Sequence, residues 1–205
     1  MKERRLPASE RRAAVLDTAC RVFARSSYRG ATTAEIAREA GVTEPILYRH
    51  FDSKQALYLA CIDDAWRRVR EAWERAVASE QDPRAWMPAM ASAFFEFKEQ
   101  KAVVASLWLQ ALTESGDEPE VRKFLRRHLR DVHEFVIDVV RRSQEAGAVP
   151  ADRDPRAEAW IFVAVGLLIA VAGRLGGLPQ GDLERIRASR RASLMGETAS
   201  RQPSV

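Results

Sequence analysis

Side chains that could contact nucleic acid cluster on one short predicted helix. The apolar residues Leu47 and Phe51 lie four positions apart, so we expect both to face inward. Their neighbours are left for solvent or a partner, and arginine can hydrogen-bond a guanine edge at two points while apolar groups can contact a thymine methyl. The predicted contact face consists of Thr33, Glu44, Pro45, Ile46, Tyr48, Arg49, His50 and Lys54.

These predicted contacts divide between the two parts of a duplex. We expect phosphate contacts mainly from Thr33, Tyr48 and Lys54, and base contacts from Arg49, Ile46 and Glu44. Structural roles stay open for two of them. Tyr48 could pack on the core of its own segment, and Glu44 could serve the positive end of the helix dipole.

The elements that must position this face are two short helices and a tight turn. Thr32 is a predicted N-cap, and Glu35 three residues later closes a capping box. Gly41 ends that helix, because the left-handed conformation costs glycine nothing sterically. Either Ser53 or Asp52 caps the helix that follows. Two short helices joined by a glycine-containing turn predict a helix-turn-helix.

This stretch resembles the DNA-binding domain of the TetR/AcrR family of bacterial transcriptional regulators, over the first 60 residues of the chain. The sequence departs from the family pattern at three positions: Ser27 stands where glycine is usual, Pro45 where a small residue is common, and Glu44 puts an acid on the face expected to meet DNA. The matching residues are Thr32–Thr33, Ile36–Ala37, Ala40–Gly41–Val42, Leu47–Tyr48, His50–Phe51, Ser53–Lys54, the upstream segment 15–19 and Phe23–Ala24.

The charge distribution agrees with a polyanionic partner. Residues 1–60 carry 11 Lys/Arg and 7 Asp/Glu, whereas residues 61–205 carry 22 of each, so the net charge of +4 lies entirely in the first segment. An ordinary solvated surface is an equally good reading of so small an excess.

The whole chain is predicted to be all-α, with about nine helices and no strand pattern. We expect a three-helix DNA-binding domain over residues 1–53, a larger helical bundle for ligand binding and dimerisation over 54–195, and a disordered tail over 196–205. Asp117 and Glu120, with Pro119 between them, predict a capping box at the start of one long helix.

Several functions lack support in the sequence. There is no phosphate-binding glycine loop and no nucleophile elbow, and His128 and His133 are poorly spaced for a metal, so we expect no enzyme, no cofactor and no metal site. No secretory signal is visible, and the longest apolar run, residues 159–173, is short for a membrane span. A cytoplasmic protein without a membrane partner is therefore expected.

One helix, from Pro155 to Gly173, is apolar almost all round and must be covered on every side. We expect a second copy of the chain to cover it, together with the helix from Asp182 to Leu194, as in the resembling family. Burial within its own domain is the alternative. The predicted dimer-interface residues are Trp160, Val163, Leu167, Val171, Leu183 and Ile186.

Large rings and methionines gather in residues 84–140 and on the preceding helix. Such side chains line adaptable apolar sites, although for any one of them a place in the core is the simpler interpretation. We expect a small hydrophobic effector, aromatic or lipid-like, and disfavour a nucleotide. The predicted pocket residues are Trp66, Trp86, Met90, Phe94, Phe97, Trp108, Leu112 and Phe124.

Together these patterns predict a homodimeric regulator, most simply a repressor that leaves a palindromic DNA operator when the effector binds. The alternative is a ligand-independent architectural or protein-binding scaffold on the same DNA-binding fold. A ligand that weakens operator binding would favour the repressor over the scaffold. The coupling free energy between ligand and DNA binding is typically about 1–3 kcal/mol, which is large enough to measure.

Overall fold

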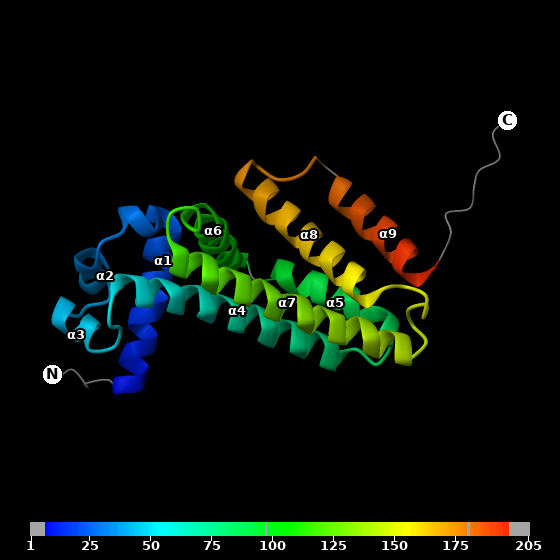
Figure 1. The fold of residues 1–205 in the computed structure, drawn as a ribbon, viewed down its shortest axis with the longest axis horizontal. Helices are drawn as coiled ribbons and strands as arrows, with labels where there is room; N and C mark the ends of the chain where they lie inside the picture. Colours follow the sequence, from blue (N-terminus) through cyan, green and yellow to red (C-terminus); the bar gives the residue numbers. More distant parts are fainter. Residues whose placement is uncertain (1–6, 97, 180, 197–205) are drawn as a thin grey trace. The chain divides into compact units, whose positions relative to one another are not determined.

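The computed structural model describes residues 7–96, 98–179 and 181–196. In these ranges the chain forms nine α-helices and no strand, which confirms the predicted all-α fold (Figure 1). The helices are α1 (Ala8–Gly30), α2 (Thr33–Glu39), α3 (Glu44–Tyr48), α4 (Lys54–Ser79), α5 (Pro83–Glu96), α6 (Lys98–Glu114), α7 (Pro119–Glu145), α8 (Pro155–Arg174) and α9 (Asp182–Met195).

The chain divides into two compact units. Unit 1 comprises residues 1–69 and 98–127, and unit 2 comprises residues 70–97 and 128–205, so α4 and α7 contribute residues to both. The domain boundaries expected at 53/54 and 195/196 separate parts with different expected functions. They need not coincide with the limits of the compact units, and they stay predictions. Of the expected tail, 196–205, only Gly196 lies among the described residues.

Unit 1 holds its helices on one hydrophobic core. Helix α1 contributes Val15 and Phe23, α2 contributes Ile36, α3 contributes Leu47 and α4 contributes Leu57, each with no exposed surface. Helix α6 packs along α1 and buries its own apolar residues in the same core (Figure 1). The short helices α2 and α3 are therefore parts of a larger packed body.

Unit 2 is organised by aromatic packing and one buried charge. The Trp73 ring stacks on Phe135, with ring centroids 5.9 Å apart, and meets Phe162 of α8 edge-on at 5.5 Å. Glu158, near the start of α8, is buried and pairs with Arg153 and with Arg190 of α9. These contacts fix α4, α7, α8 and α9 within the unit.

Helix α1 is kinked at Ser27, the position where the resembling family usually has glycine. Its φ of 65° and ψ of 170° lie in a region that is almost restricted to glycine. A hydrogen bond from the Gly30 amide to Ser27 Oγ, at 3.3 Å, partly compensates for this strain. The kink turns the chain from α1 into α2, so it belongs to the geometry of the helix-turn-helix.

We expect Ser27→Gly to stabilise the protein. Relief of the backbone strain should stabilise the folded state by about 1–3 kcal/mol. Loss of the hydrogen bond from the Gly30 amide should destabilise it by about 1 kcal/mol. The free energy of unfolding should therefore rise by roughly 1 kcal/mol. Urea unfolding followed by circular dichroism measures it. The matched control is Ser26→Gly, which places glycine in regular helix and should destabilise. If both variants lose stability equally, Ser27 is not strained.

Candidate nucleic-acid interface

The first short helix of the interface, α2, begins and ends as its sequence predicts. Thr32 Oγ1 accepts a hydrogen bond from the Glu35 amide at 3.1 Å, so Thr32 is the N-cap. The Glu35 carboxylate does not close the expected capping box; it pairs with Arg25 of α1 at 2.7 Å. Arg25 also hydrogen-bonds Glu39 and thereby holds the pKa of the Glu39 carboxyl below its usual range. These ion pairs hold α2 against α1.

A glycine turn sets the angle between α2 and α3. Gly41 has a φ of 66°, as predicted for the residue that ends α2. Its amide bonds to the Arg38 carbonyl at 3.2 Å, and the Val42 amide bonds to the Ala37 carbonyl at 2.9 Å. This pair of bonds defines a Schellman motif, which satisfies the last carbonyl groups of α2.

The second short helix, α3, presents the predicted contact residues outward. Leu47 is fully buried and Phe51 is 3% exposed, as their spacing predicts. Thr43 takes the N-cap position, but its side chain makes no capping bond. Pro45, Tyr48 and Arg49 are exposed, and the other five predicted contact residues are half-buried, namely Thr33, Glu44, Ile46, His50 and Lys54.

Three of these contact residues form a connected polar chain across the two helices. Thr33 Oγ1 lies 2.6 Å from Glu44 Oε1 and 3.2 Å from the Tyr48 hydroxyl. Because an ionised carboxylate only accepts, Thr33 donates its single proton to Glu44. Tyr48 must then donate to Thr33. The sequence did not predict these two hydrogen bonds, because its structural alternatives were core packing for Tyr48 and the helix dipole for Glu44.

Two cations lie over aromatic rings close to the interface. The Lys54 ammonium, in the first turn of α4, lies 4.9 Å from the centre of the Tyr28 ring. The Arg12 guanidinium of α1 lies 4.7 Å from the centre of the Phe51 ring. Ser53 caps α4 through a 3.0 Å bond from the Ala56 amide, which decides the choice between Ser53 and Asp52. Cation–π contacts hold both charges in place at little desolvation cost.

An ionic contact joins the helix-turn-helix to the turn between α6 and α7. Arg29 pairs with Asp117 at 2.6 Å and with the nearly buried Glu114 at 3.4 Å. Asp117 was expected to cap α7, but that helix begins at Pro119, so Asp117 lies one residue too early and its carboxylate turns to Arg29. Gln55 of α4 also contacts Glu118, at 3.4 Å. Sequence reasoning missed the role of Arg29, because its partners lie 85 or more positions away in the chain.

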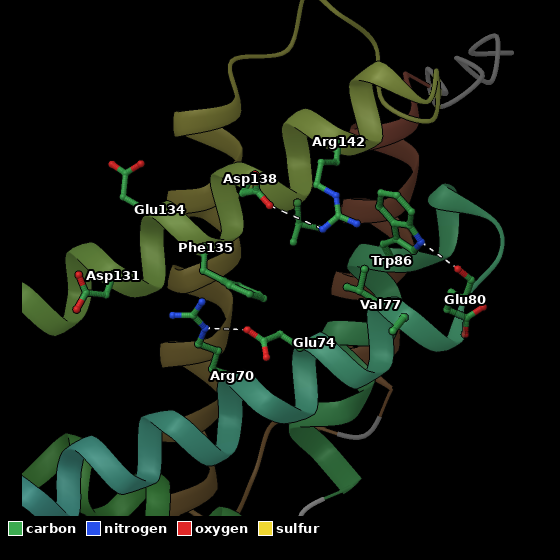
Figure 2. A pocket seen from close by; sticks show the side chains of 12 residues that line it. Arg70, Glu74, Val77, Glu80, Trp86, Asp131, Glu134, Phe135, Asp138 and Arg142 are labelled. Carbon is green, nitrogen blue, oxygen red and sulfur yellow. Dashed lines mark hydrogen bonds and ion pairs between the residues drawn. The ribbon is translucent and has the colours of Figure 1, made fainter.

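The second candidate site is an open groove of about 800 Å³ within unit 2. Five acids and two arginines line it beside two aromatic rings (Figure 2). The acids are Glu74, Glu80, Asp131, Glu134 and Asp138; the arginines are Arg70 and Arg142; the rings are Trp86 and Phe135.

Each ring in the groove already lies beneath a cation. Arg142 lies 5.0 Å from the centre of the Trp86 ring, and Arg70 lies 5.5 Å from that of Phe135 (Figure 2). Arg70 also pairs with Glu74 at 2.9 Å. The Asp131 carboxylate has no ion-pair partner among the described residues.

Only one of the predicted pocket residues, Trp86, lines this groove. Met90 is fully buried in unit 2. The side chain of Phe94 and the whole of Phe97 lie outside the described structure. The other predicted residues belong to unit 1, where Trp66, Trp108 and Phe124 are half-buried and Leu112 is 43% exposed. The pocket assignment therefore stays a prediction. Sequence reasoning missed the groove acids, because acids on a helix surface are usually only solvated.

Helix α8 leaves much of its apolar surface uncovered within the chain. Trp160 and Val171 are exposed, and Val163, Leu167, Leu183 and Ile186 are half-buried. Within the part of the chain that the structure describes, α8 is the one helix long and apolar enough to cross a membrane, and only 17% of its most apolar window is buried.

The fold and the interface define a helix-turn-helix regulator, and sequence comparison specifies its family. Residues 15–61 match the profile "Bacterial regulatory proteins, tetR family", and residues 83–195, more than half of the chain, match "BetI-type transcriptional repressor, C-terminal". The chain belongs to the TetR family, as its sequence predicted, and it is a transcriptional regulator of the TetR/BetI type.

Individual relatives agree with this assignment. The transcriptional activator FasR of Mycolicibacterium smegmatis is 40% identical over 46% of this chain and 43% of its own length. The matched stretches cover less than two thirds of the curated relatives. A TetR-family regulator from Rhodococcus sp. superposes with a TM-score of 0.81 at 19% identity, over 91% of this chain and 99% of its own. A regulator from Saccharomonospora viridis, solved in complex with choline, superposes with a TM-score of 0.70 at 25% identity. The superposition covers 89% of this chain and 94% of that protein.

Substitution of Arg49 and of Lys54 should affect DNA binding in different ways, because we expect Arg49 to contact a base and Lys54 to contact phosphate. Arg49→Ala should weaken cognate DNA binding by about 1–3 kcal/mol and relax the preference at one base pair. Lys54→Ala should weaken cognate and scrambled duplexes alike and lower the salt slope by about one. Fluorescence anisotropy at several salt concentrations measures both. If Arg49→Ala binds both duplexes as the parent does, Arg49 makes no base contact.

Proposed function

We propose that the protein is a homodimeric repressor that binds a palindromic operator through α3 and leaves it when a small organic cation binds unit 2. The observation that carries the proposal is the outward face of α3. Arg49 and Tyr48 are exposed there, while Leu47 and Phe51 anchor the helix in the core. The excess positive charge of the first 60 residues supports phosphate binding.

The uncovered face of α8 supports the homodimer. Four large apolar side chains along it are between 38% and 46% exposed: Trp160, Ile161, Leu168 and Val171. Contiguous apolar surface of this kind marks an interaction site. A second chain fits it better than a membrane, because α8 is tied through Glu158 to Arg190 of the arginine-rich α9. In such a dimer, two copies of α3 would meet half-sites about 34–36 Å apart.

The dimer proposal predicts that one charge on α8 prevents association. Leu168→Glu should give a particle of 23.1 kDa where the parent gives twice that mass, because burying an unpaired carboxylate in an apolar interface is strongly unfavourable. The matched control is Leu112→Glu on α6, since Leu112 is 43% exposed against 45% for Leu168. Light scattering at micromolar concentration measures the mass. A monomeric parent would overturn the proposal.

The chemistry of the groove supports a cationic effector with apolar substituents. Its lining carries three more acids than arginines, and its two rings already hold guanidinium groups on their faces. Aromatic faces bind quaternary ammonium groups by the same attraction. The choline complex of the Saccharomonospora viridis regulator agrees with this class of ligand. The groove thus favours a cation with apolar substituents among the small hydrophobic effectors expected from the sequence.

An effector of this class should be visible through Trp86. Choline or benzyltrimethylammonium should quench tryptophan emission and weaken operator binding, whereas decanoate should do neither. Trp86→Phe should remove the quenching, and Asp131→Asn should weaken the affinity roughly 2- to 5-fold. Asp63→Asn, an exposed acid of unit 1, is the control and should change nothing. Quenching by decanoate instead would refute the cation.

The same titration separates the alternative functions. A ligand that strengthens operator binding would favour activation, the role of the FasR relative. If no ligand changes operator binding, the scaffold hypothesis gains. Selection of bound genomic fragments by the purified protein supplies the operator for these measurements. A failure to enrich any fragment would argue against sequence-specific DNA binding altogether.

A further inference from the structure

Glu44 is an unusual side chain for a surface that binds a polyanion. It is the first residue of α3, and in helix-turn-helix proteins the N-terminal residues of the second helix meet the base edges. A carboxylate there is repelled by phosphate and can accept hydrogen bonds only. It therefore needs a donor from the protein or from a base.

In the structure that donor is Thr33. Thr33 donates to Glu44 Oε1 and in turn accepts from Tyr48. Glu44 Oε2 accepts no hydrogen bond from any residue that the structure describes. Within the protein, the Thr33 proton is therefore donated to Glu44, and the Tyr48 proton is donated to the Thr33 oxygen.

DNA binding would change this arrangement. The sequence predicts that the hydroxyls of Thr33 and Tyr48 contact phosphates, and a phosphate would compete with Glu44 for the Thr33 proton. When the hydroxyls turn to phosphate, Glu44 loses its only donor. A carboxylate left without a donor inside a closed interface is costly, so a base must replace Thr33.

Two bases offer a donor in the major groove, and they are not equivalent. Adenine presents its N6 amino group beside the N7 acceptor, which repels the second carboxylate oxygen. Cytosine presents its N4 amino group without an acceptor of its own. The carboxylate of Glu44 is therefore matched to cytosine.

We propose that Glu44 specifies cytosine at one position of each half-site by an exchange of hydrogen-bond partners, from Thr33 in the free protein to the cytosine amino group on DNA. This inference rests on the proposed operator binding. Glu44 then disfavours other sequences as well as favouring the cognate one, because at any other base its carboxylate lies near phosphates without a hydrogen-bond donor.

A competing account gives Glu44 a purely structural role. In that account the Thr33–Glu44 bond only joins α2 to α3, so removing either partner has the same effect on every sequence. Thr33→Val is the matched control, because it breaks the same bond and leaves the carboxylate in place.

The test is selection from a randomised duplex library, read by sequencing, for the parent, Glu44→Ala, Glu44→Gln and Thr33→Val, each checked for folding by thermal melting. The parent should require cytosine at one position per half-site. Glu44→Ala should reduce the enrichment of cytosine over the other bases by roughly 5- to 150-fold. Glu44→Gln should move it toward adenine, which matches an amide. Thr33→Val should weaken binding evenly and keep cytosine.

The outcomes separate this inference from the proposed function. If the parent enriches no sequence, operator binding itself fails. If the parent enriches a site but Glu44→Ala returns the same base preferences, Glu44 does not read a base. Equal effects of Glu44→Ala and Thr33→Val on all sequences would also overturn the inference and establish the structural role.

Discussion

The anchoring of α3 is the constraint on which the interface depends. A five-residue helix has no stability of its own in water, because nucleation costs more than so few hydrogen bonds return. Leu47 and Phe51 supply the missing stability, since full burial of such a side chain is worth about 1.5–3 kcal/mol. They insert into a core built by α1, α4 and α6. The direction in which Arg49 and Tyr48 point is thus set by packing outside the short helix.

The same core gives the interface a physical link to the later part of the sequence. All of α6 and the start of α7 belong to unit 1, and their buried residues share its hydrophobic core with those of α1. Arg29 reinforces that packing by pairing with the nearly buried Glu114. An isolated buried carboxylate would be costly, so Arg29 offsets the burial of Glu114 where α6 packs against α1. Any rearrangement of α6 must therefore be borne by residues that hold α2 and α3.

The sequence predicted local structure well and distant partners poorly. The cap at Thr32, the left-handed Gly41 and the inward pair Leu47 and Phe51 depend on neighbours within a few residues, so spacing alone reveals them. The partners of Arg29 and the polar chain through Thr33 depend on how separate helices meet. The predicted pocket residues have the same difficulty: an apolar helical stripe shows which side is buried, but it does not name the helix that buries it.

Helix α8 illustrates how a charge can decide an apolar interface. Glu158 is buried and held by Arg153 and by Arg190 of α9, so the helix cannot turn about its axis without breaking ion pairs in a low-dielectric environment. Successive residues point about 100° apart around a helix. A shift of one position would replace the exposed Leu168 and Val171 on this face by their half-buried or buried chain neighbours. The ion pairs contribute little apolar contact, yet they determine which apolar residues α8 offers to a partner.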